Sequence, residues 1–314
     1  MRYRPSSSIV ALICLFLGWS TSGCGPARRA PAPPPAAAAP RSTALLWQVE
    51  HAGNVSYLFG TIHLNVDVDA VLGTAGRAAL DRSRVLYVEM DLSDAQRTRS
   101  LGAAAVQAGL LPPGESLRGM LSPALWAQLQ QLLPGSPPAT LERLRPWLAA
   151  LSVIQVIAAR SHATPASQGA AFPPMDVTLV ARARAHGIPI LELDSMQQQL
   201  EAFTAMPRDQ ALAMLRELLE APETAGRELH AIVDAYDSAD AEQRLTALVG
   251  EMARRTPVFT EYLLFRRNQR WADALDGSLR AGGVFVAVGA GHLVGPRGLP
   301  ALLARRGFRV QRVP

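Results

Sequence analysis

Near its C-terminus the chain reads VFVAVGAGH over residues 284–292, and near its other end it reads VSYLFGTIH over residues 55–63. In both stretches an apolar run leads to a glycine, Gly60 or Gly289, that stands three residues before the final histidine. Strands that run into glycine-containing turns present the next polar side chain at the rim of a sheet, where α/β proteins build ligand sites. The two segments therefore predict one site that is assembled from both ends of a domain.

The histidines of these segments, His63 and His292, differ from the other four because each follows a predicted strand and a glycine. Gly60, Gly289 and Gly291 are the glycines of the two motifs. Neutral imidazole is the commonest protein metal ligand. Either histidine alone is better explained as a structural histidine, but the pair favours a functional site.

Carboxylates at the ends of two further apolar runs could complete this site. Glu89 ends the run that begins at Val85, and Glu192 and Asp194 follow the run 188–191. A carboxylate at the end of a buried strand is costly unless it is paired or binds a ligand. A salt bridge to an arginine is the alternative at both places. Two histidines and a carboxylate are a known hydrolytic zinc set, and oxygen-rich variants suit Mn²⁺ or Co²⁺.

Arg266, Arg267 and Asn268 lie near the middle of a predicted long helix over 259–280. They could supply a cation and a hydrogen-bond donor that stabilise a developing oxyanion. Taken alone, this cluster is better explained as a solvated helix face.

The first 24 residues have the pattern of a secretory signal. Arg2 and Arg4 precede an apolar run over residues 9–19 that is short for a membrane span. The small residues before Cys24 resemble the processing site of a bacterial lipoprotein, apart from Thr21, which stands where a leucine-like residue is more usual. We expect Cys24 to be lipidated, with ordinary cleavage and release as the alternative.

Residues 25–41 are dominated by proline and alanine, which predicts an extended spacer. Residues 42–314 are then expected to form one large domain. Both cysteines, Cys14 and Cys24, precede this domain, which excludes disulfides, thiolate metal sites and cysteine nucleophiles from it.

The composition and motifs exclude several other classes of protein. The formal net charge falls from +5 to +3 once Arg2 and Arg4 are removed, and the scattered arginines do not favour nucleic-acid binding. Val294 stands where a dinucleotide-binding loop that starts at Gly289 would need its last glycine, so no nucleotide cofactor is expected. The chain also has no serine-hydrolase elbow, phosphate-binding loop or His-Glu-x-x-His helix.

The apolar periodicities predict an α/β fold, with a mixed central β-sheet flanked by helices and a largely helical middle section. Predicted strands cover residues 45–49, 55–59, 84–90, 188–194, 284–288 and 308–313, and the first two form a hairpin. Predicted helices cover residues 68–82, 95–109, 123–133, 141–160, 175–186, 196–203, 208–219, 225–255, 259–280 and 299–306.

These motifs, in this order, resemble the TraB/GumN family, which includes the Tiki proteases of animals. The last block is the most specific, and the resemblance covers essentially the whole folded part. The matching stretches are Leu46 to Val49, Tyr57 to His63, Val88 to Asp91, Met175 to Leu179, Leu191-Glu192 with Gln198, Arg267-Asn268 and Phe285 to Gly295.

The resemblance implies an α/β domain in which both Gly-x-x-His segments and the acidic residue converge on a metal site. By position, His63, Glu89 and His292 would hold a divalent ion, with Mn²⁺ or Co²⁺ favoured and Zn²⁺ as the alternative. The resemblance makes three further residues candidates for contacts with the substrate or with the ligands, namely Glu192, Arg267 and Asn268.

We therefore expect a metal-dependent hydrolase of the bacterial envelope that resembles a metallopeptidase and acts on a peptide or protein. Arg267 would stabilise the oxyanion, and Glu192 would help to deprotonate the attacking water. The lipid anchor would hold the protein at a membrane facing the periplasm. Because Gly25, and not aspartate, follows Cys24, the outer membrane is favoured; the alternative is a secreted protein.

Two other functions stay open. The chain could be a non-catalytic envelope protein that binds or sequesters peptides, with His63 and His292 hydrogen-bonded inside its core. It could also be a metal-dependent esterase or another amide hydrolase on the same scaffold.

Overall fold

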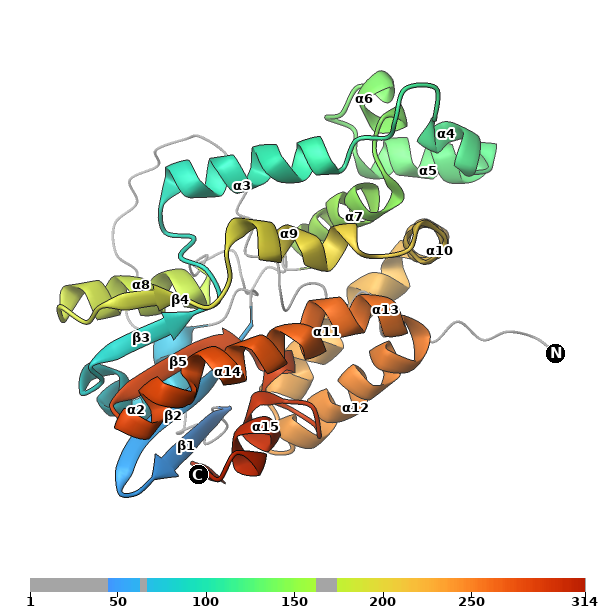
Figure 1. Cartoon of the computed structure of the whole chain (residues 1–314). Helices are drawn as coiled ribbons and strands as arrows, with labels where there is room; N and C mark the ends of the chain where they lie inside the picture. The colour runs from blue at the N-terminus through green and yellow to red at the C-terminus, as the bar shows by residue number, and fades with distance from the viewer. Residues whose placement is uncertain (1–44, 63–66, 162–173, 314) are drawn as a thin grey trace, which may run out of the picture.

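The computed structural model describes residues 45–62, 67–161 and 174–313. The predicted leader, Cys24, the whole spacer and His63 lie outside these residues. Within them, six strands form one mixed sheet in the order β4-β3-β5-β2-β1-β6, flanked by helices as the sequence predicts (Figure 1). The strands are β1 (Leu46–His51), β2 (Asn54–Thr61), β3 (Val85–Val88), β4 (Ile190–Glu192), β5 (Val284–Gly289) and β6 (Arg309–Arg312).

The predicted hairpin is confirmed, since β1 and β2 pair antiparallel and His51 lies opposite Asn54. The two turn residues, Ala52 and Gly53, have φ angles of 48° and 82°. Such positive angles are typical of the two-residue turns that match the twist of a hairpin. Strand β6 pairs antiparallel with β1 on its other side.

The strands β4, β3, β5 and β2 run parallel, so their carboxyl ends meet at one edge of the sheet, which we call the carboxyl edge. At this edge Thr61 pairs with Gly289, and Val88 pairs with both Ala287 and Glu192. All residues of β5 are buried, which explains its continuous apolar sequence. Ligand sites of open α/β sheets form at such an edge.

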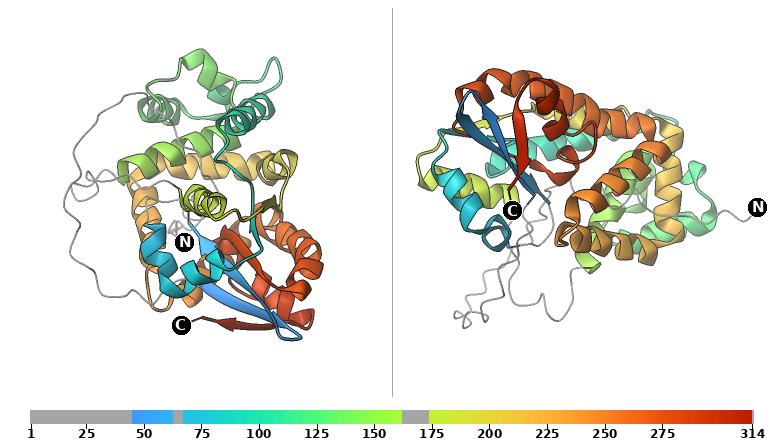
Figure 2. Two further views of the ribbon diagram at one scale, coloured as in Figure 1. Left: turned by 90° about the vertical axis from the view of Figure 1, so that its left-hand side faces the viewer. Right: turned by 90° about the horizontal axis from the view of Figure 1, so that it is seen from below.

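Helices cover both faces of the sheet (Figure 2). Helix α14 packs against β1 and β2, and α2 and α8 lie on the opposite side, while the middle helices form a helical part beside the sheet (Figure 1). The α-helices are α2 (Val68–Asp81), α3 (Ala95–Ala108), α4 (Leu117–Met120), α5 (Pro123–Leu132), α6 (Pro138–Glu142), α7 (Pro146–Ser161), α8 (Met175–Ala185), α9 (Met196–Thr204), α10 (Arg208–Glu220), α11 (Pro222–Tyr236), α12 (Ala241–Arg255), α13 (Pro257–Thr260), α14 (Arg266–Ala281) and α15 (Leu299–Arg305).

Three predicted helices differ from the structure. The helix predicted over 141–160 is wrong at its start, because α7 begins at Pro146 and Leu144 instead bridges to Leu110. The helix predicted over 225–255 is two helices, α11 and α12, joined by a turn. Both keep an apolar face on the same core, so the helical periodicity continues across the turn.

The helix predicted over 259–280 contains a π-helical turn, η1 (Glu261–Phe265), between α13 and α14. A π-turn inserts one extra residue into a helical turn and is often found at functional sites. An apolar pattern alone gives no sign of it. Within the described ranges, no helix combines the length and the apolar character needed to cross a membrane.

Candidate functional site

Glu89 and His292 meet at the carboxyl edge of the sheet. Glu89 directly follows β3, and His292 ends a short 3-10 turn, η2 (Ala290–His292), directly after β5. Oε1 of Glu89 lies 3.7 Å from Nε2 of His292 and accepts a 2.7 Å hydrogen bond from the backbone N–H of Gly289. The side chain of His292 is fully buried, and that of Glu89 is 11% exposed. The structure thus brings together two of the three predicted metal ligands. The third, His63, lies outside the described residues.

The glycine that opens the first motif is required by close packing. A Cβ atom at Gly60 would lie 3.0 Å from Cβ of Leu45 and 3.2 Å from Cα of Ala290. Strand β2 therefore approaches the turn after β5 more closely than a side chain at this position would allow. The carbonyl of Gly60 accepts a 2.6 Å hydrogen bond from the buried hydroxyl of Tyr236.

Asn268 determines which nitrogen of His292 carries the proton. The amide nitrogen of Asn268 donates to the carbonyl of Arg297 at 2.8 Å, so its Oδ1 faces the ring and lies 2.5 Å from Nδ1. Nδ1 then carries a proton, and Nε2 faces Oε1 of Glu89 and Nη1 of Arg267, a group that can only donate. Partners of this kind are typical of metal-binding histidines.

Arg267 crosses the site as a buried cation with 1% exposure. Its Nη2 donates to Oε2 of Glu89 at 2.5 Å, its Nε donates to Oδ2 of Asp194 at 2.7 Å, and its Nη1 donates to the carbonyl of Leu263 at 3.1 Å. The guanidinium also lies 4.6 Å from the ring centroid of Trp271. Burial alone would lower the pKa of Arg267, but the two adjacent carboxylates outweigh it and raise the pKa.

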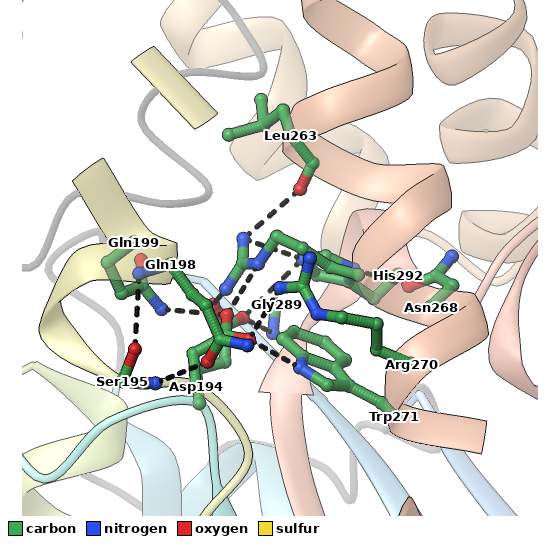
Figure 3. A network of polar contacts seen from close by, with 12 residues as sticks. Asp194, Ser195, Gln198, Gln199, Leu263, Asn268, Arg270, Trp271, Gly289 and His292 are labelled. Carbon is green, nitrogen blue, oxygen red and sulfur yellow. Dashed lines mark hydrogen bonds and ion pairs between the residues drawn. The ribbon is translucent and has the colours of Figure 1, made fainter. Parts of the chain in front are cut away.

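Asp194 is the other centre of this network; the sequence names it with Glu192 as a carboxylate that could complete the site, but the family resemblance selects only Glu192. Its side chain is fully buried. Besides Arg267 it accepts hydrogen bonds from Nη2 of Arg270 at 3.0 Å, Nε1 of Trp271 at 2.9 Å and Nε2 of Gln199 at 3.3 Å (Figure 3). The available signal was its place after an apolar run, a feature that it shares with Glu192.

Glu192, the sequence candidate for proton transfer, has a different set of contacts. Oε1 accepts from the backbone N–H of Asp91 at 2.7 Å, and Oε2 accepts from Nη2 of Arg97 at 2.7 Å. Its side chain is 24% exposed and that of Arg97 is 42% exposed. In the described part of the chain, no polar contact joins Glu192 to Glu89 or His292, so Glu192 lies at the rim of the carboxyl edge.

The interpretation of residues 266–268 as a solvated helix face is wrong for two of the three. Arg267 and Asn268 are each 1% exposed, whereas Arg266 is exposed. The first turns of α14 lie over the carboxyl edge, where one side chain contacts Glu89 and the next contacts His292. The π-turn directly precedes them, and its Leu263 carbonyl accepts from Arg267.

The chemistry and spacing of the two described donors fit a divalent cation. Two ligands that lie about 2.1 Å from a tetrahedral ion are roughly 3.4 Å apart, close to the 3.7 Å between Oε1 of Glu89 and Nε2 of His292. A carboxylate with an imidazole suits Zn²⁺, Mn²⁺ or Co²⁺. Among the described residues no group of three His, Cys, Asp or Glu side chains could hold an ion. A metal site here would therefore need a ligand from outside the described residues, where His63 is the sequence candidate.

The fold and this edge define an α/β protein with a buried, charged site at the carboxyl ends of parallel strands. A model of the TraB/PrgY/gumN family matches residues 45–312, and the chain belongs to this family. An uncharacterized protein of Treponema pallidum (strain Nichols) is 25% identical over 279 residues, which cover 83% of this chain and 80% of that protein.

A second relative carries a functional name. A metalloprotease TIKI homolog of Amphimedon queenslandica is 24% identical over 324 residues, which cover 85% of this chain. The match takes in 61% of the homolog's own length, so the chain spans less than two thirds of it. No solved structure matches the chain.

Proposed function

We propose that this protein is a metal-dependent hydrolase of the cell envelope that cleaves peptide bonds. Membership of the TraB/PrgY/gumN family and the name of the TIKI homolog support this class of activity. The observation that carries the proposal is the approach of Glu89 to His292 at 3.7 Å, with Nδ1 of the histidine hydrogen-bonded to Asn268.

In this proposal His63, Glu89 and His292 hold the ion, with Mn²⁺ or Co²⁺ favoured and Zn²⁺ as the alternative. When bound, such an ion lowers the pKa of water and polarises a carbonyl oxygen. Asn268 keeps the His292 ring in its orientation and tautomer. The N–H of Gly289 holds Oε1 of Glu89 toward His292.

Arg267 supplies a fixed positive charge. Its raised pKa keeps it charged, and its 1% exposure places the charge where water screens it little. A preorganised charge of this kind stabilises the negative oxygen that develops when a carbonyl is attacked. Glu192 is partly exposed at the rim, and the N–H of Asp91 and Arg97 engage its two oxygens, so we propose that it contacts the substrate and do not assign it the proton transfer.

Metal binding and peptide cleavage test this function together. We expect the purified wild-type protein to bind one divalent ion per chain, and His63→Ala and His292→Ala to lose it while staying folded. His186→Ala is the control, because His186 lies at the end of α8 with its ring against the carbonyl of Arg182. Cleavage of a peptide library should stop in EDTA and return with Mn²⁺ or Co²⁺.

The other outcomes identify the alternatives. A folded wild type with no bound divalent ion would refute the hydrolase and favour a protein that binds or sequesters peptides. Bound metal with ester or small-amide hydrolysis, but no peptide cleavage, would assign the site to another substrate class.

The location of the protein is a separate proposal, a lipid anchor at Cys24 that faces the periplasm, with the outer membrane favoured. In a bacterial host, wild type should incorporate labelled fatty acid and sediment with membranes, whereas Cys24→Ser should not. Release of both proteins into the soluble fraction would exclude the anchor.

A further inference from the structure

We propose that Asp194 is a positioning residue that holds Arg267 by its Nε edge and so keeps Glu89 and His292 able to bind a divalent cation. The proposal rests on the metal-dependent function above and concerns the same site. Its central feature is one cation that two buried carboxylates share.

Arg267 contacts these carboxylates through different nitrogens. Nε donates to Asp194 at 2.7 Å and Nη2 donates to Glu89 at 2.5 Å, while Nη1 lies 3.3 Å from Nε2 of His292. The guanidinium therefore meets the same two side chains that the metal ion would need. A cation beside a ligand weakens the binding of a second cation by electrostatic repulsion. The affinity for the ion thus depends on how strongly Arg267 is held elsewhere.

Asp194 makes the contacts needed to hold Arg267 in place. Four donors from α9 and α14 occupy its two oxygens, two of them from Arg270 and Trp271. The carboxylate is fully buried, so it would act on the reaction through Arg267. Burying a carboxylate is costly unless its oxygens are hydrogen-bonded, and here four donors offset that cost.

Trp271 links the two halves of the site. Its Nε1 donates to Asp194 at 2.9 Å, and its ring lies 4.6 Å from the guanidinium carbon of Arg267 and 4.3 Å from the ring of His292. The tryptophan thus packs against the held cation and against the proposed ligand.

The first test is Mn²⁺ binding by the purified protein, measured by electron paramagnetic resonance. Asp194→Asn keeps the shape but removes the charge, so the full charge of Arg267 acts on Glu89. We expect Mn²⁺ to bind about 10-fold more weakly or worse, the range typical of groups that support metal ligands. The matched control is Asp81→Asn. Asp81 forms a comparable pair with Arg182, at 2.8 and 2.7 Å, at the end of α2 before β3. This control should keep wild-type Mn²⁺ affinity.

A double variant separates positioning from a general structural role. Adding Arg267→Gln to Asp194→Asn removes the competing cation, so Mn²⁺ affinity should recover by several-fold. If Asp194→Asn does not fold, Trp271→Phe takes its place, because phenylalanine keeps a ring but lacks the donor to Asp194. It should weaken Mn²⁺ binding with a native near-UV circular dichroism spectrum.

The outcomes distinguish this inference from the proposed function. Wild type that binds no divalent ion refutes both. If wild type binds Mn²⁺ and folded Asp194→Asn binds it with equal affinity, only the role of Asp194 is refuted. Where Asp194→Asn does not fold, equal affinity in Trp271→Phe has the same meaning. Weaker binding in Asp194→Asn that Arg267→Gln does not restore also refutes it, because the loss would then be structural.

Discussion

Replacing Glu228 with glutamine should stabilise the protein above neutral pH and change it little at pH 5. Glu228 lies on α11 in a half-buried position, and its Oε2 is buried without a hydrogen-bond partner in the described part of the chain. Burial, and then the nearby charge of Glu217, raise the pKa of Glu228 from 4.5 to about 8. Arg255 lowers the pKa of Glu228 by a smaller amount, since Arg255 forms a salt bridge with Glu217 at 2.8 Å.

The sign follows from which state binds the proton. The unfolded carboxyl group titrates near 4.5 and the folded one near 8, so between these values the folded state binds more protons. The stability contributed by Glu228 is therefore fully present below pH 4.5 and is lost as the pH rises through 8. The pKa difference corresponds to at most about 5 kcal/mol. Because water reaches the half-buried side chain and screens its charge, we expect about 1–2 kcal/mol.

Urea unfolding followed by circular dichroism at pH 5, 7 and 9 measures this effect. Glu228→Gln resembles the protonated form, so its free energy of unfolding should exceed that of wild type by about 1–2 kcal/mol at pH 9 and by less at lower pH. Glu223→Gln, on the same helix but exposed, is the control for a lost surface charge. Equal pH dependence in wild type and Glu228→Gln would show that Glu228 does not carry a raised pKa.

Two further predictions concern packing at the two ends of the parallel strands, near the site for Tyr236 and at the far end of β5 for Gly282. Tyr236→Phe should reduce the free energy of unfolding by about 1–3 kcal/mol, since the buried carbonyl of Gly60 loses its 2.6 Å hydrogen bond. The control is Tyr87→Phe, because the half-buried hydroxyl of Tyr87 contacts Ser278 and its loss should reduce the free energy of unfolding less in the same urea titration. An equal reduction in both variants would contradict this reasoning. Gly282→Ala should cost about 2 kcal/mol or more, because Gly282 has a φ of 73° and its Cβ would lie 2.7 Å from that of Asn54. Gly187→Ala, with a φ of 68° in open space, should cost only about 1 kcal/mol in thermal unfolding, and the reverse order would disprove the steric argument.

Much of the fold could be predicted because its signals are local. The apolar runs before Gly289 and Gly60 each predict a strand, and the structure shows that the two strands are parallel neighbours. Helix ends were less certain. The apolar periodicity over 225–255 indicates a buried helix face but gives no sign of the turn between α11 and α12, because both helices bury their apolar faces in one core.

The network around Arg267 could not be predicted in the same way. Asp194 is 73 residues from Arg267 in sequence, and Glu89 is 178 residues from it. A polar side chain on a helix has the same sequence pattern whether it meets water or a buried carboxylate. The burial of Arg267 and Asn268 depends on where α14 lies over the sheet.

By itself the sequence predicted that Glu89 and His292 belong to one site, because each closely follows an apolar run; the structure shows that these runs form parallel strands, which end at one edge of the sheet. Only the tertiary structure decided that Asp194 would lie beside Arg267, with Glu192 at the rim. Glu192 and Asp194 follow the same apolar run. Strand β4 ends at Glu192, two residues before Asp194. Which of them meets the buried cation is determined by the packing of α14, whose Arg267 and Trp271 lie 73 and 77 residues from Asp194 in sequence, and no local pattern encodes such a long-range contact.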